Sequence, residues 1–336
     1  MTGIQPKRDE NVRSNAKSCV LRLSIQPQIQ TLKTKRNILK LHEQWRHEYN
    51  QDRYLSHLSD IDLSGRLRYF VENLTTLELN GKIGLKDIRN NPAQTLMRKF
   101  THAHQELVLR KRQPELQFLE GSSIPKAMIG HEARLKELNR YAHDKKPDLI
   151  KFGKKEYFEK LSFKVSLASS FSDPLLNAAR IDDEMKAIYY PNPSDISVTI
   201  RGGAKLEGIK GVKVMFEAPA DYYIMCTSSS FDVRLFGDFD ADSCLFVYDS
   251  QRFSKDLLDQ ISKQVPVISH ASAQVTYVDP IRPNLGAPQS VEFHKHIKYL
   301  YQNEFRHVFI SDTGNNPKDL FFNLPGSSVY TEIVCL

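Results

Sequence analysis

Gln302 and Glu304 lie two positions apart, and an amide beside a carboxylate could catalyse a reaction at a glycosidic carbon. We predict a strand over Tyr301–Arg306, on which alternate side chains share a face, so Gln302 and Glu304 would lie together and Asn303 apart. A fixed carboxylate there could stabilise an oxocarbenium-like sugar, and the amide could orient an acceptor. The alternative is an amphipathic strand that shows both side chains to solvent.

A run of hydroxyls upstream, Thr227–Ser229, follows the apolar segment Tyr222–Cys226. A hydroxyl at a strand end can bond a carboxylate and fix its rotamer, so we expect Ser228 to support Glu304. Since the two motifs are far apart in the chain, an excursion over 239–264 has to bring them together. Taken alone, the run is also typical of a serine-rich turn.

Two kinds of side-chain cluster contain residue types that bind metal ions, but neither has the ligand arrangement of a metal site. Three consecutive acids, Asp182–Glu184, lie in a helix predicted over Leu175–Ile188, where neighbours fan out around the axis, so we expect a solvated face. Two histidine pairs lack the four ligands of a zinc site and have no cysteine nearby; they are His102/His104 and His294/His296. We therefore expect no metal.

The motifs in this order resemble those of arginine-type ADP-ribosyltransferases, which carry a basic residue, a Ser-Thr-Ser-like motif and a Gln/Glu-x-Glu motif on successive strands. Thr227–Ser229 matches the second and Gln302–Glu304 the third. Lys151, followed by Phe152-Gly153, holds the place of the family's arginine, and Arg201 is a later basic candidate. A wider pattern resembles uncharacterised bacterial proteins, some associated with phage defence; its parts are Ile150–Gly153, Phe171–Pro174, Ile181–Glu184, Arg234–Cys244, Val275–Pro280, Phe293–Lys295 and Tyr301–Arg306.

The resemblance implies an NAD-dependent transferase, a bacterial toxin or phage-defence effector that modifies a nucleic acid (RNA favoured) or a protein. Glu304 would stabilise the ribosyl cation, Gln302 would orient the acceptor, and Ser228 would support Glu304. NAD would be a substrate, and the residues expected to contact it are Lys151, Arg201, Thr227, Ser229, Tyr223 and Phe231.

Two other hypotheses stay open. The first is a non-catalytic module of the same fold that binds nucleic acid or protein. The second is a metal-dependent nuclease, whose carboxylates would be Asp182, Asp183, Glu184 and Glu304. Magnesium dependence would distinguish the nuclease, because ADP-ribosylation needs no metal. An antitoxin or chaperone could restrain a toxin, and the sequence does not name the acceptor.

The composition is that of a soluble protein, with 40% hydrophobic and 26% charged residues among 336. The four cysteines have no CxxC spacing, which favours reduced thiols in a cytoplasm. The start of the sequence has no apolar stretch typical of a secretory signal, and no run reaches the roughly 20 apolar residues of a membrane helix. We therefore expect a cytoplasmic protein without a membrane partner.

The net charge of +7 is unevenly spread, because the first 140 residues hold 25 Lys and Arg against 15 Asp and Glu. The remainder holds 22 basic and 25 acidic residues. A basic first half indicates a partner that is a nucleic acid (RNA favoured) or an acidic protein. A solvated helical surface rich in lysine is the alternative.

Periodicity divides the chain into a flexible lead-in (1–27), a basic helical region (28–146) and an ADP-ribosyltransferase-like α+β domain (147–336). Helices are predicted over Ile29–Tyr49, Asp62–Leu74, Pro92–Leu107, His131–Ala142, Lys155–Leu161, Leu175–Ile188 and Ser254–Gln264. Strands are predicted over Leu149–Phe152, Phe163–Leu167, Ile196–Arg201, Gly211–Phe216, Tyr222–Thr227, Cys244–Tyr248, Gln274–Val278, Glu304–Ser311 and Tyr330–Val334.

Overall fold

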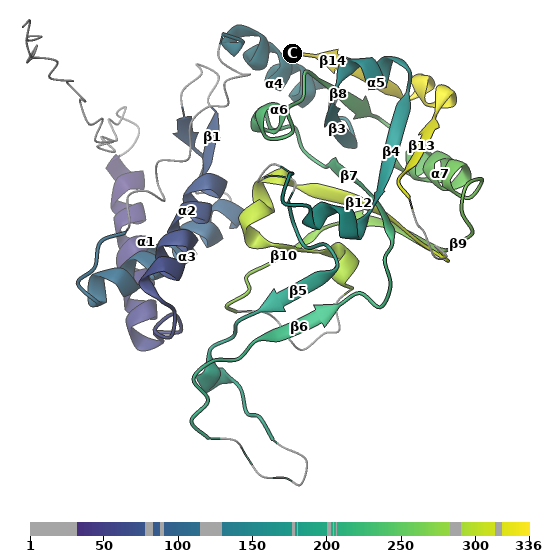
Figure 1. Ribbon diagram of the computed structural model, residues 1–336. Helices are drawn as coiled ribbons and strands as arrows, with labels where there is room; N and C mark the ends of the chain where they lie inside the picture. Colours follow the sequence, from purple (N-terminus) through teal and green to yellow (C-terminus); the bar gives the residue numbers. More distant parts are fainter. Residues whose placement is uncertain are drawn as a thin grey trace, which may run out of the picture. The chain divides into compact units, whose positions relative to one another are not determined.

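The fold is mixed α+β, with helices and mainly antiparallel sheets, as the sequence predicts. The chain divides into two compact units, Met1–Glu43 and Gln44–Leu336, and the second holds the sheets. The lead-in predicted over 1–27 lies outside the described residues. The computed structural model (Figure 1) describes residues 32–77, 83–87, 91–114, 130–176, 179, 181–199, 203, 205, 207–282, 290–312 and 318–336.

Four helices precede the large sheet, and they confirm the four helical segments predicted there. They are α1 (Leu32–Gln51), α2 (Asp60–Leu74), α3 (Asn91–Leu109) and α4 (Glu132–Lys145). α2 begins with a capping box, in which Ser59 Oγ accepts a hydrogen bond from the Asp62 N–H at 3.1 Å. The helix therefore begins slightly before the predicted start at Asp62, with Ser59 as its cap. Within the described part of the chain, no helix combines the length and apolar character needed to cross a bilayer.

An eight-stranded sheet organises the C-terminal part of the chain (Figure 1), and its neighbouring strands are antiparallel. Six strands follow the order β13-β4-β7-β3-β8-β14, and β12 pairs with both β7 and β9. The strands are β3 (Leu149–Gly153), β4 (Ser162–Leu167), β7 (Tyr223–Ser228), β8 (Ser243–Val247), β9 (Val267–Gln274), β12 (Glu304–Ser311), β13 (Leu320–Asn323) and β14 (Thr331–Cys335).

The sheet splits along one edge of β7. On its other edge β7 pairs with β12 from Tyr223 to Ser228. On the split edge, β4 pairs with the start of β7 at Tyr223 and Ile224, whereas β3 pairs with its end at Ser228. β3 and β4 therefore diverge, and the middle of β7, Met225–Thr227, faces the gap between them.

Alternating side chains on the strands build two cores, one on each face of the sheet. Leu149, Leu245 and Val247 pack with α7 (Ser250–Ile261) on one face. On the other face Ile150, Phe152, Cys244 and Phe246 pack with Leu135, Leu138 and Ala142 of α4 and with α6 (Arg234–Asp238). α4 and α7 thus cover opposite faces, and the strand ends near the split stay open to ligands.

Several predicted elements are wrong. No helix occupies the described residues of 175–188, and β5 (Lys186–Tyr189) pairs there with β6 (Val214–Glu217). Residues 196–198 are irregular, and Thr199 forms only an isolated bridge with Lys205. The sequence also missed β9 and β13. The remaining strands are the pairs β1 (Thr75–Leu77) with β2 (Ile83–Leu85) and β10 (Thr276–Val278) with β11 (His294–His296), and the remaining α-helix is α5 (Lys155–Glu159).

Asn73, at the end of α2, connects this helix to the segment that leads into β12. Its side chain is buried, its Nδ2 donates to Lys298 O at 2.8 Å, and its Oδ1 accepts from Tyr301 N at 2.8 Å. Lys298 and Tyr301 belong to the 3-10 helix η7 (Ile297–Gln302), which directly precedes Glu304. The contact therefore fixes the approach of the chain to β12.

We predict that Asn73→Ala lowers the free energy of unfolding by ~1–3 kcal/mol, because buried backbone groups of η7 lose their partner. Urea unfolding followed by circular dichroism measures the change. Asn139→Ala, on the exposed side of α4, is the matched control and should stay within ~0.5 kcal/mol of the wild type. Equal effects of the two substitutions would contradict the role given to Asn73.

Candidate active site

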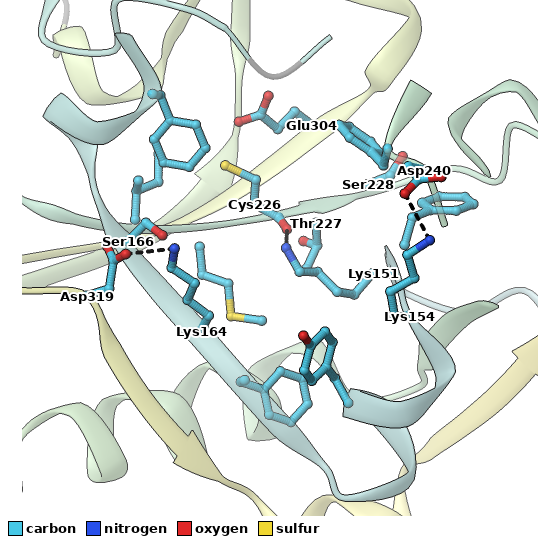
Figure 2. Close-up of a pocket in the computed structure, with 18 of the residues that line it drawn as sticks. Lys151, Lys154, Lys164, Ser166, Cys226, Thr227, Ser228, Asp240, Glu304 and Asp319 are labelled. Atoms are coloured by element: carbon cyan, nitrogen blue, oxygen red, sulfur yellow. Dashed lines mark hydrogen bonds and ion pairs between the residues drawn. The ribbon is translucent and has the colours of Figure 1, made fainter. Parts of the chain in front are cut away.

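A cavity of about 710 Å³ lies where β3 and β4 part from each other along β7 (Figure 2). This volume is within the ~300–1,000 Å³ range of small-molecule and cofactor sites. Its wall combines polar side chains on or next to the three strands with Gln302, which precedes β12, and Glu304, which begins it. The polar side chains that matter below are Lys151, Lys154, Lys164, Ser166, Thr227, Ser228, Gln302 and Glu304.

The structure brings the two sequence motifs together at this cavity. Glu304, the first residue of β12, lies opposite Ser228, the last residue of β7, in the antiparallel ladder. The intervening chain leaves through β8 and α7 and returns through β9, so the expected excursion over 239–264 does join the motifs. Ser228 Oγ lies 2.7 Å from the backbone oxygens of Gln302 and Ser230. Ser228 therefore holds the turn that carries Gln302, and the Glu304 carboxylate is held by other groups.

Gln302 does not belong to a strand, contrary to the prediction over Tyr301–Arg306. It ends η7, and Asn303 follows in the left-handed region at φ 43°, which asparagine tolerates better than most residues. The Ser229 N–H donates to Asn303 O at 2.8 Å and fixes this turn. Gln302 and Glu304 still line the same cavity, because the turn replaces the strand alternation that we expected.

Four buried charged side chains form a closed ring that includes the Glu304 carboxylate. Arg306 Nε binds Oε1 of Glu304 at 2.5 Å, and Lys295 Nζ binds Oε2 at 2.6 Å. The same cations bind Glu184, with Arg306 Nη2 at 2.5 Å and Lys295 Nζ at 3.4 Å from its carboxylate. No side chain in the ring is more than 5% exposed. We call these four residues the charge ring; each charge in it has two opposite neighbours.

The charge ring keeps Glu304 ionised. Burial alone would raise the pKa of the Glu304 carboxyl, but the charges of Arg306 and Lys295 outweigh burial and hold this pKa well below its usual range. Burial also opposes the charged form of Lys295, whereas Glu304 and Glu184 raise the pKa of Lys295 well above its usual value. An anionic carboxylate is therefore available beside the cavity at neutral pH.

The acidic run 182–184 is not the solvated helical face that we predicted. Glu184 is buried in the charge ring, whereas Asp183 is exposed. Asp182 lies near the ring, and burial together with the charge of Glu184 raises the pKa of Asp182 to about 6. The four carboxylates named for a metal-dependent nuclease therefore do not share one environment. Glu184 and Glu304 are paired with Lys295 and Arg306, so these cations hold the oxygens that a metal would need. Within the described residues, no group of three or more His, Cys, Asp or Glu could hold a metal.

Two of the side chains expected to contact NAD line the cavity. Lys151, on β3, donates to Cys226 O at 2.8 Å across the split in the sheet. Thr227, on β7, is buried and donates to Phe305 O at 3.0 Å, so its hydroxyl proton is already engaged. Lys151 therefore satisfies a β7 carbonyl that the diverging strands leave unpaired.

The other expected contacts lie elsewhere. Tyr223 is 2% exposed in the core beside α7, so its ring has no face free for a ligand. Ser229 and Phe231 line a second cavity next to α4. Arg201 lies outside the described residues.

Two lysines that we did not single out from the sequence flank the cavity (Figure 2). Lys154 pairs with Asp240 at 3.0 Å, and Lys164 pairs with Asp319 at 2.7 Å. Their side chains are 40% and 50% exposed, and exposed ion pairs contribute at most ~1 kcal/mol, so an anionic ligand could compete for them. In Figure 2 Lys151 lies between the two, which gives one side of the cavity three lysines.

Sequence reasoning also missed the partners of Glu304. Arg306 carried a usable signal, since a charge two residues after Glu304 on a strand shares its face. Lys295 and Glu184 belong to the wider pattern given above, but no local spacing pairs them with Glu304, because only the tertiary fold joins them to β12. Searches of protein-family models, curated proteins and solved structures found no match. The resemblance to ADP-ribosyltransferases therefore rests on the motifs alone.

We predict that Arg306→Met destabilises the fold by ~3–5 kcal/mol, because two buried carboxylates would then share one lysine. Adding Glu184→Gln should recover part of the loss, since Glu304 and Lys295 would remain as a balanced pair. Urea unfolding of the single and double variants measures both effects. Arg112→Met, an exposed arginine near Asp60, is the control and should change stability little. A double variant no more stable than Arg306→Met would contradict the ring.

We predict that the free energy of unfolding depends on pH through the carboxyl group of Asp182. Its pKa is higher in the folded than in the unfolded state, so its contribution to stability falls as pH rises from about 3.8 to about 6. Asp182→Asn should therefore be more stable than the wild type above pH 6, by at most ~3 kcal/mol because Asp182 is only partly buried, and show no advantage below pH 4. Urea midpoints measured across this range test the prediction. A constant difference at all pH values would contradict it.

Proposed function

We propose that the protein is an NAD-dependent ADP-ribosyltransferase, acting in the cytoplasm of a bacterium as a toxin or phage-defence effector. The observation that carries the proposal is the meeting of the two motifs: Glu304 lies opposite Ser228 beside a cavity large enough for a cofactor. The lysines around this cavity suit a pyrophosphate. These features come from four separate strands, and their convergence on one cavity supports the proposal.

The ionised Glu304 suits the cleavage of the bond between nicotinamide and ribose. As this bond breaks, nicotinamide leaves as a neutral molecule with the bonding electrons, and positive charge develops on the ribose. A fixed carboxylate in a site of low dielectric stabilises this charge. The lowered pKa of Glu304 makes it a poor proton acceptor, so the acceptor's proton would pass to water as the new bond to ribose forms.

The neighbouring side chains take roles that follow from their chemistry. Gln302 would orient the acceptor, while its Nε2 donates to Ala179 O at 2.9 Å and its amide oxygen remains an acceptor. Lys151 would contact the pyrophosphate as a point charge, with Lys154 and Lys164 at its sides. Lys295 and Arg306 would act through Glu304 by holding its charge and orientation, so we assign them as positioning residues.

A binding module of the same fold is the second candidate. One observation favours it, because the charge ring pairs every one of its charges within the protein. In such a module Glu304 would be structural, and the cavity would bind a ligand without cleaving it. Nicotinamide release separates the two candidates, since only the enzyme produces it.

We predict that purified protein transfers label from NAD to total RNA or lysate, and that Glu304→Gln lowers the rate ~100-fold or more. Digestion of the product with RNase or protease identifies the acceptor, with RNA expected. Glu332→Gln is the matched control, because this carboxylate bonds the hydroxyls of Tyr141 and Tyr248 away from the cavity. Full activity of Glu304→Gln, or no NAD cleavage by the wild type, would contradict the proposal.

Glu304→Gln breaks the charge ring, so a second variant tests the cavity without touching the ring. Ser166, on β4, lines the cavity, and Ser166→Phe would fill part of it. We expect Ser166→Phe to abolish NAD binding in calorimetric titration while the urea midpoint stays near that of the wild type. Unchanged NAD affinity would place the dinucleotide elsewhere.

A further inference from the structure

A second cavity, of about 770 Å³, lies between α4 and the turn that follows β7. One wall is a basic stripe on α4, and the opposite wall comes from the turn. The side chains that matter are Lys136, Arg140, His143, Lys146, Ser230 and Phe231. The reaction proposed above assigns no role to the residues that line this cavity.

The sequence of α4 dictates the basic wall. Leu135, Leu138 and Ala142 bury one side of the helix in the core. Lys136, Arg140 and His143 are four and three positions apart, so they follow one another along the exposed side. The helix thus presents a row of basic groups that packing against the sheet holds in place.

The cavity carries little opposing charge. Glu137 is the one acid among its described lining residues, and it pairs with Arg134 at 2.9 Å. Among the described carboxylates, none lies within 4.0 Å of a side-chain nitrogen of Lys136, Arg140 or Lys146, although these three side chains are exposed. The wall is therefore suited to a polyanion, and the half-buried Phe231 adds an aromatic surface.

The two cavities share a thin wall at the end of β7. Ile150 lines both of them, Ser228 lines the first, and Ser230 lines the second. Between them, Ser229 Oγ donates to Asn303 O at 3.0 Å, and Asn303 separates Gln302 from Glu304. A chain bound in the second cavity would therefore pass close to the turn that carries the proposed catalytic pair.

We propose that the second cavity binds the sugar-phosphate backbone of a single-stranded nucleic acid. Basic side chains bind phosphate without regard to sequence, and an aromatic wall stacks unpaired bases. The cavity holds a few nucleotides, which suits a single strand rather than a duplex. RNA and DNA share this phosphate chemistry, and the serine hydroxyls could also bond a ribose 2′-hydroxyl. The further idea that this strand is the acceptor rests on the proposed function.

Fluorescence anisotropy of a labelled single-stranded uridine oligonucleotide tests the proposal, with a deoxythymidine oligonucleotide and a duplex as further arms. The double variant Lys136→Glu/Arg140→Glu should weaken RNA binding ~10-fold or more and reduce the slope of log affinity against log salt by ~1.4, the value for two lost phosphate contacts. The matched control is Lys255→Glu/Lys263→Glu, which changes the net charge equally at exposed positions on and after α7.

Unchanged RNA affinity in the α4 variant, an equal loss in the control, or tighter binding of the duplex would overturn the proposal. Nicotinamide release without RNA distinguishes this outcome from a failure of the proposed function. The α4 variant should still release nicotinamide into water, whereas Glu304→Gln should keep its RNA affinity and release nicotinamide ~100-fold more slowly. RNA binding by a wild type that cleaves no NAD would support the second cavity and reject the transferase.

Discussion

The buried charge ring is the interaction on which the site depends. Removing four charges from water is costly, and only their mutual pairing makes the arrangement stable. The ring ties β12, through Glu304 and Arg306, to β11, through Lys295, and to the segment before β5, through Glu184. Three parts of the chain must therefore fold together before a charged carboxylate can lie beside the cavity. The same pairing that stabilises the fold keeps Glu304 anionic and fixes its rotamer, which is what stabilisation of a developing cation requires.

The split in the sheet forms the cavity that gives a ligand access to Glu304 of the charge ring. If β3 and β4 followed β7 in a continuous ladder, Met225–Thr227 would be covered and Glu304 would lie in a closed core. Their divergence leaves a cavity whose unpaired backbone is partly satisfied by Lys151. The hydroxyl of Ser228 and the left-handed Asn303 then shape the turn between the two cavities. The two cavities thus lie on either side of one irregularity at the end of β7.

Local patterns predicted the strands that build the site but not its electrostatics. Apolar residues of β7 and β12 alternate between the core beside α7 and a separate cluster that holds Ile224 and Val308, so periodicity found both strands. The strand assignment of Gln302 is wrong because this residue ends a 3-10 helix, and the left-handed Asn303 separates that helix from β12. The alternation of side chains gives no sign of such a turn. β9 escaped because it is largely exposed and rich in small polar residues. The ion pair between Arg306 and Glu304 could have been predicted, because the two side chains share a face of the strand. The pairs with Lys295 and Glu184 could not, because only tertiary packing brings these residues to β12. The helix predicted over Leu175–Ile188 is wrong. Residues 181–185 are irregular and Lys186 begins β5, and in this conformation Glu184 forms its ion pairs with Lys295 and Arg306.

The most direct test of this account is a crystal structure of the protein with a non-cleavable carba analogue of NAD. The account predicts that the analogue occupies the cavity between β3 and β4, with its pyrophosphate near Lys151. It also predicts the 2′-hydroxyl of the nicotinamide-bearing ring at ~2.5–3.0 Å from the Glu304 carboxylate. An analogue bound elsewhere, or one seated in the cavity with this ring turned away from Glu304, would contradict the central claim.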